Sequence, residues 1–117
     1  MDKSSSIGTE SIAALDAIDH LALEVDDIDS AVAWYQERFR CEVLYKDATW
    51  AMLEFSNLKL AFVVKEEHPP HLGIVREDAE KFGKLKQHRD GSRSCYLKGP
   101  GGNVVEVLTP YSLNQAE

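Results

Sequence analysis

The stretch HPPHLGIV, from His68 to Val75, has a close counterpart earlier in the chain, IDHLALEV from Ile18 to Val25. In both, a histidine is followed by a leucine, a small residue and aliphatic residues, a pattern typical of a strand. The two histidines, His20 and His71, lie about fifty residues apart. Similarity at this spacing predicts an internal duplication, with a site between its two halves.

The residues after Val25 predict a helix and then three strands. Asp27 or Asp29 is expected to cap the helix, because a carboxylate there can accept a backbone N–H. The helix carries an apolar stripe at spacings of three and four, formed by Ile28, Val32, Tyr35 and Phe39. Three strands are expected at residues 41–47, 49–56 and 58–65. The first half therefore has the order β-α-β-β-β.

The second half repeats this order in a shorter form. Residues 71–75 predict a strand, and residues 76–85 predict a short helix with Ala79 and Phe82 facing inward. Residues 84–90 either extend this helix or form a short edge strand, and the pattern leaves both open. Two further strands, at residues 92–98 and 103–108, are joined by the turn sequence GPGGN.

These boundaries predict one domain at residues 17–110, made of modules 17–66 and 70–110. A flexible arm, residues 1–16, is expected before the domain, and a tail, residues 111–117, after it. With 117 residues the chain is long enough for one core without disulfide staples.

Composition limits the partners and the compartment. The net charge of −7 argues against nucleic acid and anionic membranes, because both need a basic face. No apolar run reaches the roughly 18 residues of a spanning helix, and the polar N-terminus lacks the apolar core of a signal peptide. The two cysteines fit neither a disulfide framework nor a metal motif, so the cytoplasm is the expected compartment.

Three residues on the predicted strands are candidate metal ligands. His20 shares a strand face with Ala22, and His71 shares one with Gly73, so a small residue leaves room beside each ring. Glu106 lies within VVEVL, where a buried carboxylate is costly unless it is paired or bound to a metal. Two imidazoles and a carboxylate suit Fe²⁺, Mn²⁺, Ni²⁺ or Zn²⁺. The alternative is two histidines satisfied within the fold and a solvated glutamate.

The chain contains the segments IDHLALEVDDIDSAVAWYQERF (residues 18–39), HLGIV (71–75) and SCYLKGPGGNVVEV (94–107). From about Ala17 to Thr109 it resembles the vicinal oxygen chelate superfamily, which includes glyoxalase I, extradiol dioxygenases, methylmalonyl-CoA epimerase, fosfomycin-resistance thiol transferases and bleomycin-binding proteins. The resemblance implies an α+β fold of two βαβββ-type modules, the second abbreviated. Their curved mixed sheets would surround a groove, with the helices outside.

The resemblance also implies the ligand set. The family's metal ligands fall on His20, His71 and Glu106, which would hold one divalent metal per site. Glyoxalase I has a fourth ligand in the last strand of the first half, where the alignment of SNLKLAFV with GGNVVEVL places Ala61. The implied set is therefore two histidines and one glutamate, as in fosfomycin-resistance enzymes and extradiol dioxygenases.

Tyr96 is the candidate catalytic residue. If GPGGN is a five-residue connection, Tyr96 faces Glu106 across a hairpin. Its hydroxyl could hydrogen-bond an oxyanion or donate a proton, and the alternative is a packing aromatic residue. The candidate substrate-binding residues are Trp50, His88, Arg89 and Arg93. For the last three, the alternative is a solvated loop.

The resemblance implies a small metalloenzyme of the lyase/isomerase or thiol-transferase type, which chelates substrate oxygens and stabilises an oxyanion or enolate. The alternatives are a non-enzymatic small-molecule or antibiotic-binding protein of the bleomycin-resistance type, or a ring-cleaving dioxygenase.

The resemblance further implies a homodimer with shared metal sites. In that arrangement His20 of one subunit completes a site with His71 and Glu106 of the partner subunit. The stiffness of Pro69 and Pro70 between the modules favours such an arrangement, because it disfavours a tight reversal of the chain.

Overall fold

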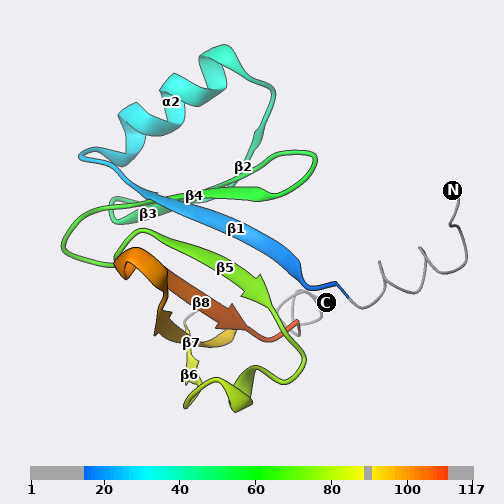
Figure 1. Cartoon of the computed structure of the whole chain (residues 1–117). Helices are drawn as coiled ribbons and strands as arrows, with labels where there is room; N and C mark the ends of the chain where they lie inside the picture. The colour runs from blue at the N-terminus through cyan, green and yellow to red at the C-terminus, as the bar shows by residue number, and fades with distance from the viewer. Residues whose placement is uncertain (1–14, 89–90, 111–117) are drawn as a thin grey trace, which may run out of the picture.

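The computed structural model describes residues 15–88 and 91–110, which form one eight-stranded mixed sheet with an α-helix outside it (Figure 1). The strands are β1 (Ala17–Glu24), β2 (Glu42–Lys46), β3 (Trp50–Glu54), β4 (Lys59–Val63), β5 (His71–Val75), β6 (Lys86–Gln87), β7 (Arg93–Lys98) and β8 (Val104–Leu108). The helical segments are α2 (Ile28–Arg38) and two 3-10 turns, η1 (Ala79–Lys81) and η2 (Pro100–Gly102). The strand order is β2-β3-β4-β1-β5-β8-β7-β6.

The two halves of the sheet have the same pattern of neighbours. In the first half β4 lies between β3 and β1 and pairs with β1 in parallel. In the second half β8 lies between β7 and β5 and pairs with β5 in parallel. The antiparallel β1–β5 pair joins the halves into one sheet. The predicted α+β fold with a curved mixed sheet is confirmed, and the two halves repeat the same strand arrangement, although the second half has the 3-10 turn η1 in place of a helix.

α2 covers the outer face of the first half. Its N-cap is Asp27, one of the two predicted caps, whose carboxylate accepts the backbone N–H of Ser30 at 2.8 Å. Ile28 and Val32 are buried beneath the helix, whereas Phe39 is half exposed. Of the predicted stripe, Ile28 and Val32 therefore face the core. There they pack with Ala51, Leu53, Leu60 and Phe62.

The helix predicted at residues 76–85 is wrong, because the structure has only the three-residue η1 there. Asp78 precedes η1 but caps nothing with its side chain, since both carboxylate oxygens accept hydrogen bonds from Arg76 at 2.8 and 2.9 Å. Gly83 follows within two residues, and glycine weakens a helix. Ala79 is buried as predicted, but Phe82 stays 38% exposed.

The ambiguity at residues 84–90 is resolved for the part that the structure describes. Lys86 and Gln87 form the short edge strand β6, which pairs with β7. The turn between β7 and β8 is closed by the Gly99 N–H, which donates to the Asn103 carbonyl at 2.7 Å. Gly101 within it has φ of +71°, a left-handed conformation that favours glycine.

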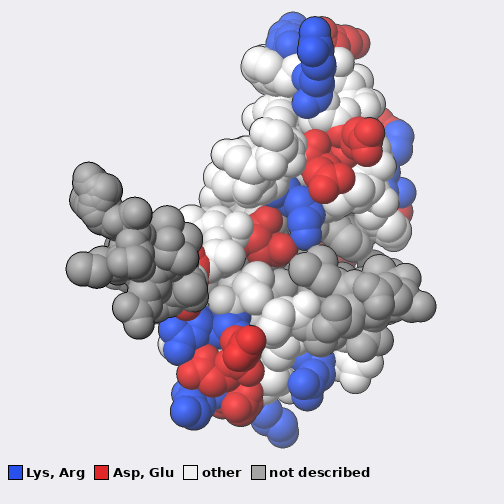
Figure 2. Space-filling view, turned by 90° about the vertical axis from the view of Figure 1, so that its right-hand side faces the viewer, with Lys and Arg blue, Asp and Glu red and all other residues white. Residues whose placement is uncertain are grey.

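Charged side chains of both signs occupy the face of the molecule that Figure 2 shows. On the face in Figure 2, basic side chains are interspersed with acidic ones and form no continuous basic area. Within the described residues, no helix combines the length and the apolar character needed to span a membrane. The mixed charge on this face agrees with the expectation that nucleic acid is not a partner. That expectation remains a prediction.

Candidate metal centre

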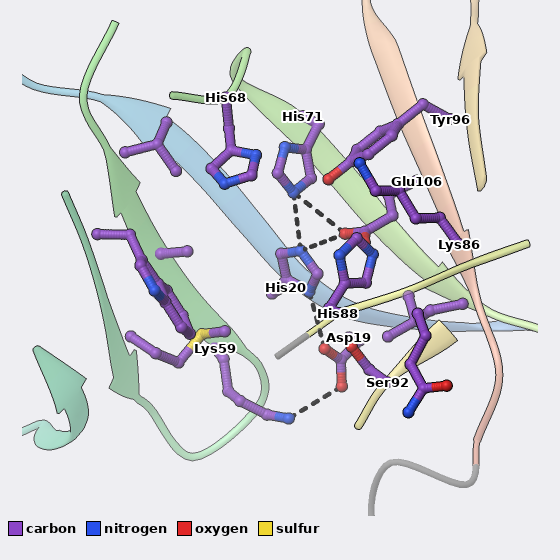
Figure 3. A pocket seen from close by; sticks show the side chains of 16 residues that line it. Asp19, His20, Lys59, His68, His71, Lys86, His88, Ser92, Tyr96 and Glu106 are labelled. Atoms are coloured by element: carbon purple, nitrogen blue, oxygen red, sulfur yellow. Dashed lines mark hydrogen bonds and ion pairs between the residues drawn. The ribbon is translucent and has the colours of Figure 1, made fainter. Parts of the chain in front are cut away.

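Three neighbouring strands bring the predicted ligands together. His20 on β1 lies opposite Gly73 on β5, and Gly73 lies opposite Glu106 on β8. His71 precedes Gly73 by two residues and therefore shares its face of the sheet. Figure 3 shows the two imidazoles and the carboxylate pointing toward one another.

The three ligand atoms form a nearly equilateral triangle. His20 Nε2 lies 3.0 Å from His71 Nε2 and 3.1 Å from Glu106 Oε1. His71 Nε2 lies 3.2 Å from the same Glu106 oxygen. Nitrogen and oxygen ligands sit about 2.1 Å from a divalent ion. Ligands at that distance from one ion are themselves roughly 3 Å apart, so the spacing fits a common metal.

Gly73 makes this approach possible. A Cβ atom at this position would lie 2.3 Å from His20 Cε1 and 2.6 Å from Nδ1, well inside any normal contact. Only the absence of a side chain at Gly73 leaves room for the ring of His20 beside β5, where it reaches His71. Gly73, the small residue predicted beside His71, is therefore required because the ring of His20 on the neighbouring strand occupies the space.

Hydrogen bonds fix which nitrogen of each ring carries the proton. His71 Nδ1 lies 2.8 Å from the carbonyl oxygen of Pro69, which can only accept, so Nδ1 must donate. His20 Nδ1 lies 2.8 Å from the Asp19 carboxylate and donates to it in the same way. Neutral rings then direct both Nε2 lone pairs toward Glu106. This is the tautomer that metal-binding histidines adopt.

Three electron-rich atoms at this separation require a positive charge among them. Burial lowers the pKa of His20, but hydrogen bonds and charge from Asp19 and Glu106 outweigh burial and raise it to about 9. Burial raises the pKa of Glu106, but hydrogen bonds with His20, His71 and Ser94 hold it well below its usual range. A proton on His20 therefore supplies the charge in metal-free protein, and a divalent ion would replace it.

The second oxygen of Glu106 is held from the other side. The Ser94 hydroxyl, which is buried, donates to Glu106 Oε2 at 2.7 Å. Its only proton is used there, so Ser94 Oγ accepts from His88 Nε2 at 2.6 Å. This chain fixes the rotation of the carboxylate, and Oε1 remains for the ligand triangle.

A β-bulge explains how Asp19 reaches the site. Asp19 precedes His20 and would face the opposite side of a regular strand. The β1–β5 register shifts between Ile18 and His20, which turns consecutive side chains toward the same side. The Lys59 ammonium lies 3.0 Å from the second oxygen of Asp19 (Figure 3).

No protein-family model matches the chain, and no curated protein matches its sequence. Solved structures do match it. Methylmalonyl-CoA epimerase from Mycobacterium tuberculosis has a TM-score of 0.68 at 16% identity, covering 86% of this chain and 92% of that chain. A methylmalonyl-CoA epimerase from Streptomyces coelicolor, solved with 2-nitronate-propionyl-CoA, has a TM-score of 0.63 at 20% identity, covering 82% and 98%. A glyoxalase/bleomycin resistance protein/dioxygenase superfamily member from Vibrio splendidus has a TM-score of 0.64 at 12% identity, covering 81% and 99%.

The chain has the vicinal oxygen chelate fold. At these identities the likeness concerns the fold alone, and the chemistry has to be argued from the residues.

In this vicinal oxygen chelate fold one chain supplies the whole triad. The expected division of His20 from His71 and Glu106 between subunits is wrong, because β1 and β5 of the same chain pair directly. The linker accommodates both prolines. It has seven residues, 64–70, and turns early, where the Glu67 N–H donates to the Val64 carbonyl at 3.0 Å. Pro69 and Pro70 follow this turn and lie outside the reversal.

The register shows that Ala61 offers no fourth ligand at the position equivalent to Glu106. In the β5–β8 pair Glu106 lies opposite Gly73, two residues after His71. In the β1–β4 pair Ala61 lies opposite Ala22, two residues after His20. Ala61 thus occupies the position in the first module that Glu106 occupies in the second, as the alignment of the two sequences predicts.

The triad opens onto a cavity of about 440 Å³. Of the candidate catalytic and substrate-binding residues, Tyr96, Trp50 and His88 line it. Tyr96 lies opposite Glu106 on β7, as the hairpin predicted. The structure does not bring Arg93 to the cavity, because Arg93 is exposed on β7 next to the inward Ser94. Arg89 lies outside the described residues.

Several polar residues of the site were not predicted. Ser94 could have been found, because it shares a strand face with Tyr96 by the period of two. Lys59 could also have been found, because it lies two residues before Ala61 and shares its strand face. Asp19 could not, since the bulge that turns it inward leaves no pattern in the sequence. His68, interpreted as a loop residue, lines the cavity although it lies outside the ligand triangle.

Proposed function

We propose that this chain is a metal-dependent enzyme in which His20, His71 and Glu106 hold one divalent metal. The observation that supports this most strongly is the convergence of three ligand atoms within 3.2 Å, with both histidine Nδ1 atoms committed to other partners. The donor set suits Fe²⁺, Mn²⁺, Ni²⁺ or Zn²⁺. Such an ion supplies Lewis-acid chemistry that stabilises an oxyanion or enolate of the substrate.

The reaction proposed is of the lyase/isomerase or thiol-transferase type. Among these we propose an isomerase that moves a proton next to a carbonyl group, because the triad and the phenol of Tyr96 beside it suit the stabilisation of an enolate. The shape of the cavity selects the carbonyl substrate, and the cavity is large enough for a small molecule.

Tyr96 is proposed as the residue that donates a hydrogen bond or proton to the substrate. Its ring packs edge-on against His71, with centroids 5.5 Å apart, and its side chain is 41% exposed toward the cavity. Burial and the charge of Glu106 raise the pKa of the phenol well above its usual range, so Tyr96 keeps its proton near neutral pH. A protonated phenol beside the triad can stabilise negative charge that develops on a substrate oxygen.

His88 and Trp50 are proposed to contact the substrate from opposite modules. His88 donates its Nε2 proton to Ser94, which leaves Nδ1 as the ring's acceptor. Arg89 and Arg93 remain predictions from the sequence, with no contact in the described residues that supports them.

We also propose that the chain forms a homodimer in the cytoplasm. β2 is an outer strand of the sheet, and Val43, Leu44 and Tyr45 on it are each more than a third exposed. Exposed apolar edge strands favour association. The two cysteines, Cys41 and Cys95, are free thiols, which agrees with a reducing compartment.

Proton exchange tests the enzymatic proposal. Thioesters and 2-oxo acids with exchangeable α-hydrogens are incubated in D₂O and followed by proton NMR. Metal-dependent exchange is expected with the wild type, none with His71→Ala, and exchange roughly 10–100-fold slower with Tyr96→Phe at unchanged metal content. Metal-loaded wild-type protein that exchanges none of these compounds would favour the binding protein over the enzyme.

A further inference from the structure

The two modules line the cavity with side chains of opposite character. Tyr96 lies opposite Glu106 in the β7–β8 pair, and Met52 lies opposite Ala61 in the β3–β4 pair. Since Ala61 and Glu106 are equivalent, Met52 is the counterpart of Tyr96. Two residues before these lie Trp50 and Ser94, which are equivalent by the same register. Three polar residues of the second module, Glu106, Tyr96 and Ser94, therefore have the apolar counterparts Ala61, Met52 and Trp50 in the first.

The apolar residues form a continuous wall. Ala22, Ala61 and Val63 are buried together, and Trp50 and Met52 pack against them. This cluster is separate from the core beneath α2, because it lies on the opposite face of the same strands. All of these residues except Ala22 line the cavity. The wall thus belongs to the site and serves no helix packing.

Trp50 is held in place before any ligand binds. Its indole stacks on Tyr45, with ring centroids 4.4 Å apart and planes 26° apart. The turn before it is fixed by Asp47, whose Oδ1 accepts the backbone N–H groups of Thr49 and Trp50 at 2.8 and 3.0 Å. A preorganised aromatic surface loses little conformational entropy when a ligand packs on it.

A basic residue at the edge of this wall is neutralised. Lys59 on β4 is bound to Asp19 at 3.0 Å, and Asp19 in turn holds His20. Figure 3 shows this pair on the side of the pocket away from Lys86 and Tyr96. The wall therefore presents an apolar surface beside the triad, while Lys86 and His88 line the cavity from the second module.

We infer that the wall of Trp50, Met52, Ala61 and Val63 is a binding subsite for a flat apolar substituent, about the size of a phenyl ring, carried next to the oxygens of the substrate that reach the triad. The substrate class is then a small oxygen chelator with an aromatic or similarly flat apolar group. This inference rests on the proposed metal-dependent function, since the triad defines which end of the substrate is oxygen-rich.

Two hydroxamates that differ only in this substituent test the inference. Acetohydroxamate and benzohydroxamate offer the same pair of adjacent oxygens, with a methyl or a phenyl group beside them. Their dissociation constants are measured by calorimetry on protein loaded with Zn²⁺. Benzohydroxamate is expected to bind roughly tenfold or more tightly, because the phenyl group loses its water on the wall.

Variants locate the preference on the wall. Trp50→Ala is expected to reduce the ratio of the two constants to less than about threefold, and Trp50→Phe to keep most of it. Trp34→Ala is the matched control, because Trp34 is exposed on α2 and does not line the cavity. This control also leaves Trp50 as the only tryptophan, so quenching of its fluorescence by benzohydroxamate reports contact directly.

Different results would contradict the subsite and the proposed metal-dependent function. Equal affinities for the two hydroxamates, or an unchanged preference in Trp50→Ala, would overturn the subsite. Elemental analysis of the same samples tests the proposed function separately, because a chain that takes up no metal would refute it whatever the hydroxamate ratio.

Discussion

Ala61 in the first module and Glu106 in the second occupy equivalent places on equivalent strands, yet one is a methyl group and the other a buried carboxylate. The same contrast holds between Met52 and Tyr96. The second module contributes His71, Glu106 and the Ser94 support, whereas the first contributes His20 and an apolar wall. A duplicated framework thus fixes where side chains point without fixing what they are.

The modules also differ in what stabilises them. The first has α2 over a core that includes Leu53 and Phe62. The second has only η1, over a smaller cluster centred on Ala79, Cys95 and Val107. We conclude that the first module carries more of the packing and the second more of the polar chemistry.

The largest effect is expected at the contact between the modules. Gly73→Ala places a Cβ against the His20 ring, so the ring must move and the triangle must open. We expect Zn²⁺ affinity to fall by roughly 100-fold, measured by competition with a chelating dye. Gly83→Ala is the control, because its new Cβ would make only an ordinary 3.4 Å contact with Cys95. Equal affinity in both variants would contradict the steric role of Gly73.

The second prediction makes the first module resemble the second at the position of Ala61. Ala61→Glu would place a second carboxylate at the position equivalent to Glu106. Because an added anionic ligand strengthens cation binding, we expect Zn²⁺ affinity to rise roughly tenfold and benzohydroxamate binding to weaken. Ala61→Val fills similar space without a ligand and should raise no affinity. Tighter metal binding in the valine variant would show that space, and not the carboxylate, is what matters.

A smaller effect concerns protons. His20 must lose its proton to bind a metal, and its pKa in metal-free protein is about 9. Zn²⁺ affinity should therefore rise with pH through the neutral range, by up to about tenfold per unit, and level off above about pH 9. Asp19→Asn removes a partner that raises this pKa, so the plateau should begin at a lower pH.

The control for this titration is Asp26→Asn, since Asp26 is exposed next to α2. The Zn²⁺ affinity of each protein is measured from pH 6.5 to 9.5, a range that includes the His20 pKa of about 9, so that the pH at which each curve levels off can be compared. Identical curves for the wild type and Asp19→Asn would rule out a role of Asp19 through the proton on His20.

The smallest effect compares the two aspartates that precede the helical segments. Asp27→Ala removes the cap of α2 and should lower the thermal midpoint by roughly 4–8 °C, as loss of an N-cap does in a small domain. Asp78→Ala should lower it less, because Asp78 forms a partly exposed pair with Arg76 and its side chain caps nothing. A larger loss for Asp78→Ala would contradict the view that the first module carries more of the stability.

The sequence predicted what depends on local pattern. The repeated histidine strands follow from the period of two, a cap at Asp27 or Asp29 from the capping preference of aspartate, and the opposition of Tyr96 and Glu106 from the length of the GPGGN turn. The position of Ala61 followed from comparing the halves with each other. These features could be predicted because each is determined by a few neighbouring residues.

What depends on distant contacts could not be predicted. The pairing of β1 with β5 within one chain places the whole triad in that chain, and no local pattern distinguishes it from pairing between subunits. The bulge that turns Asp19 inward also belongs to that pair. The absence of a longer helix at residues 76–85 accompanies the pairing of Arg76 with Asp78, which the spacing of Ala79 and Phe82 does not reveal.

The central claim is that His20, His71 and Glu106 bind one divalent metal within a single chain. The most direct measurement is the metal content of protein purified without a chelating column and then equilibrated with Zn²⁺. We predict about one ion per chain for the wild type and for His68→Ala, which changes a cavity histidine outside the triangle. His71→Ala should bind none stoichiometrically. A wild type that takes up no metal, or a His71→Ala variant that binds as much as the wild type, would contradict the account.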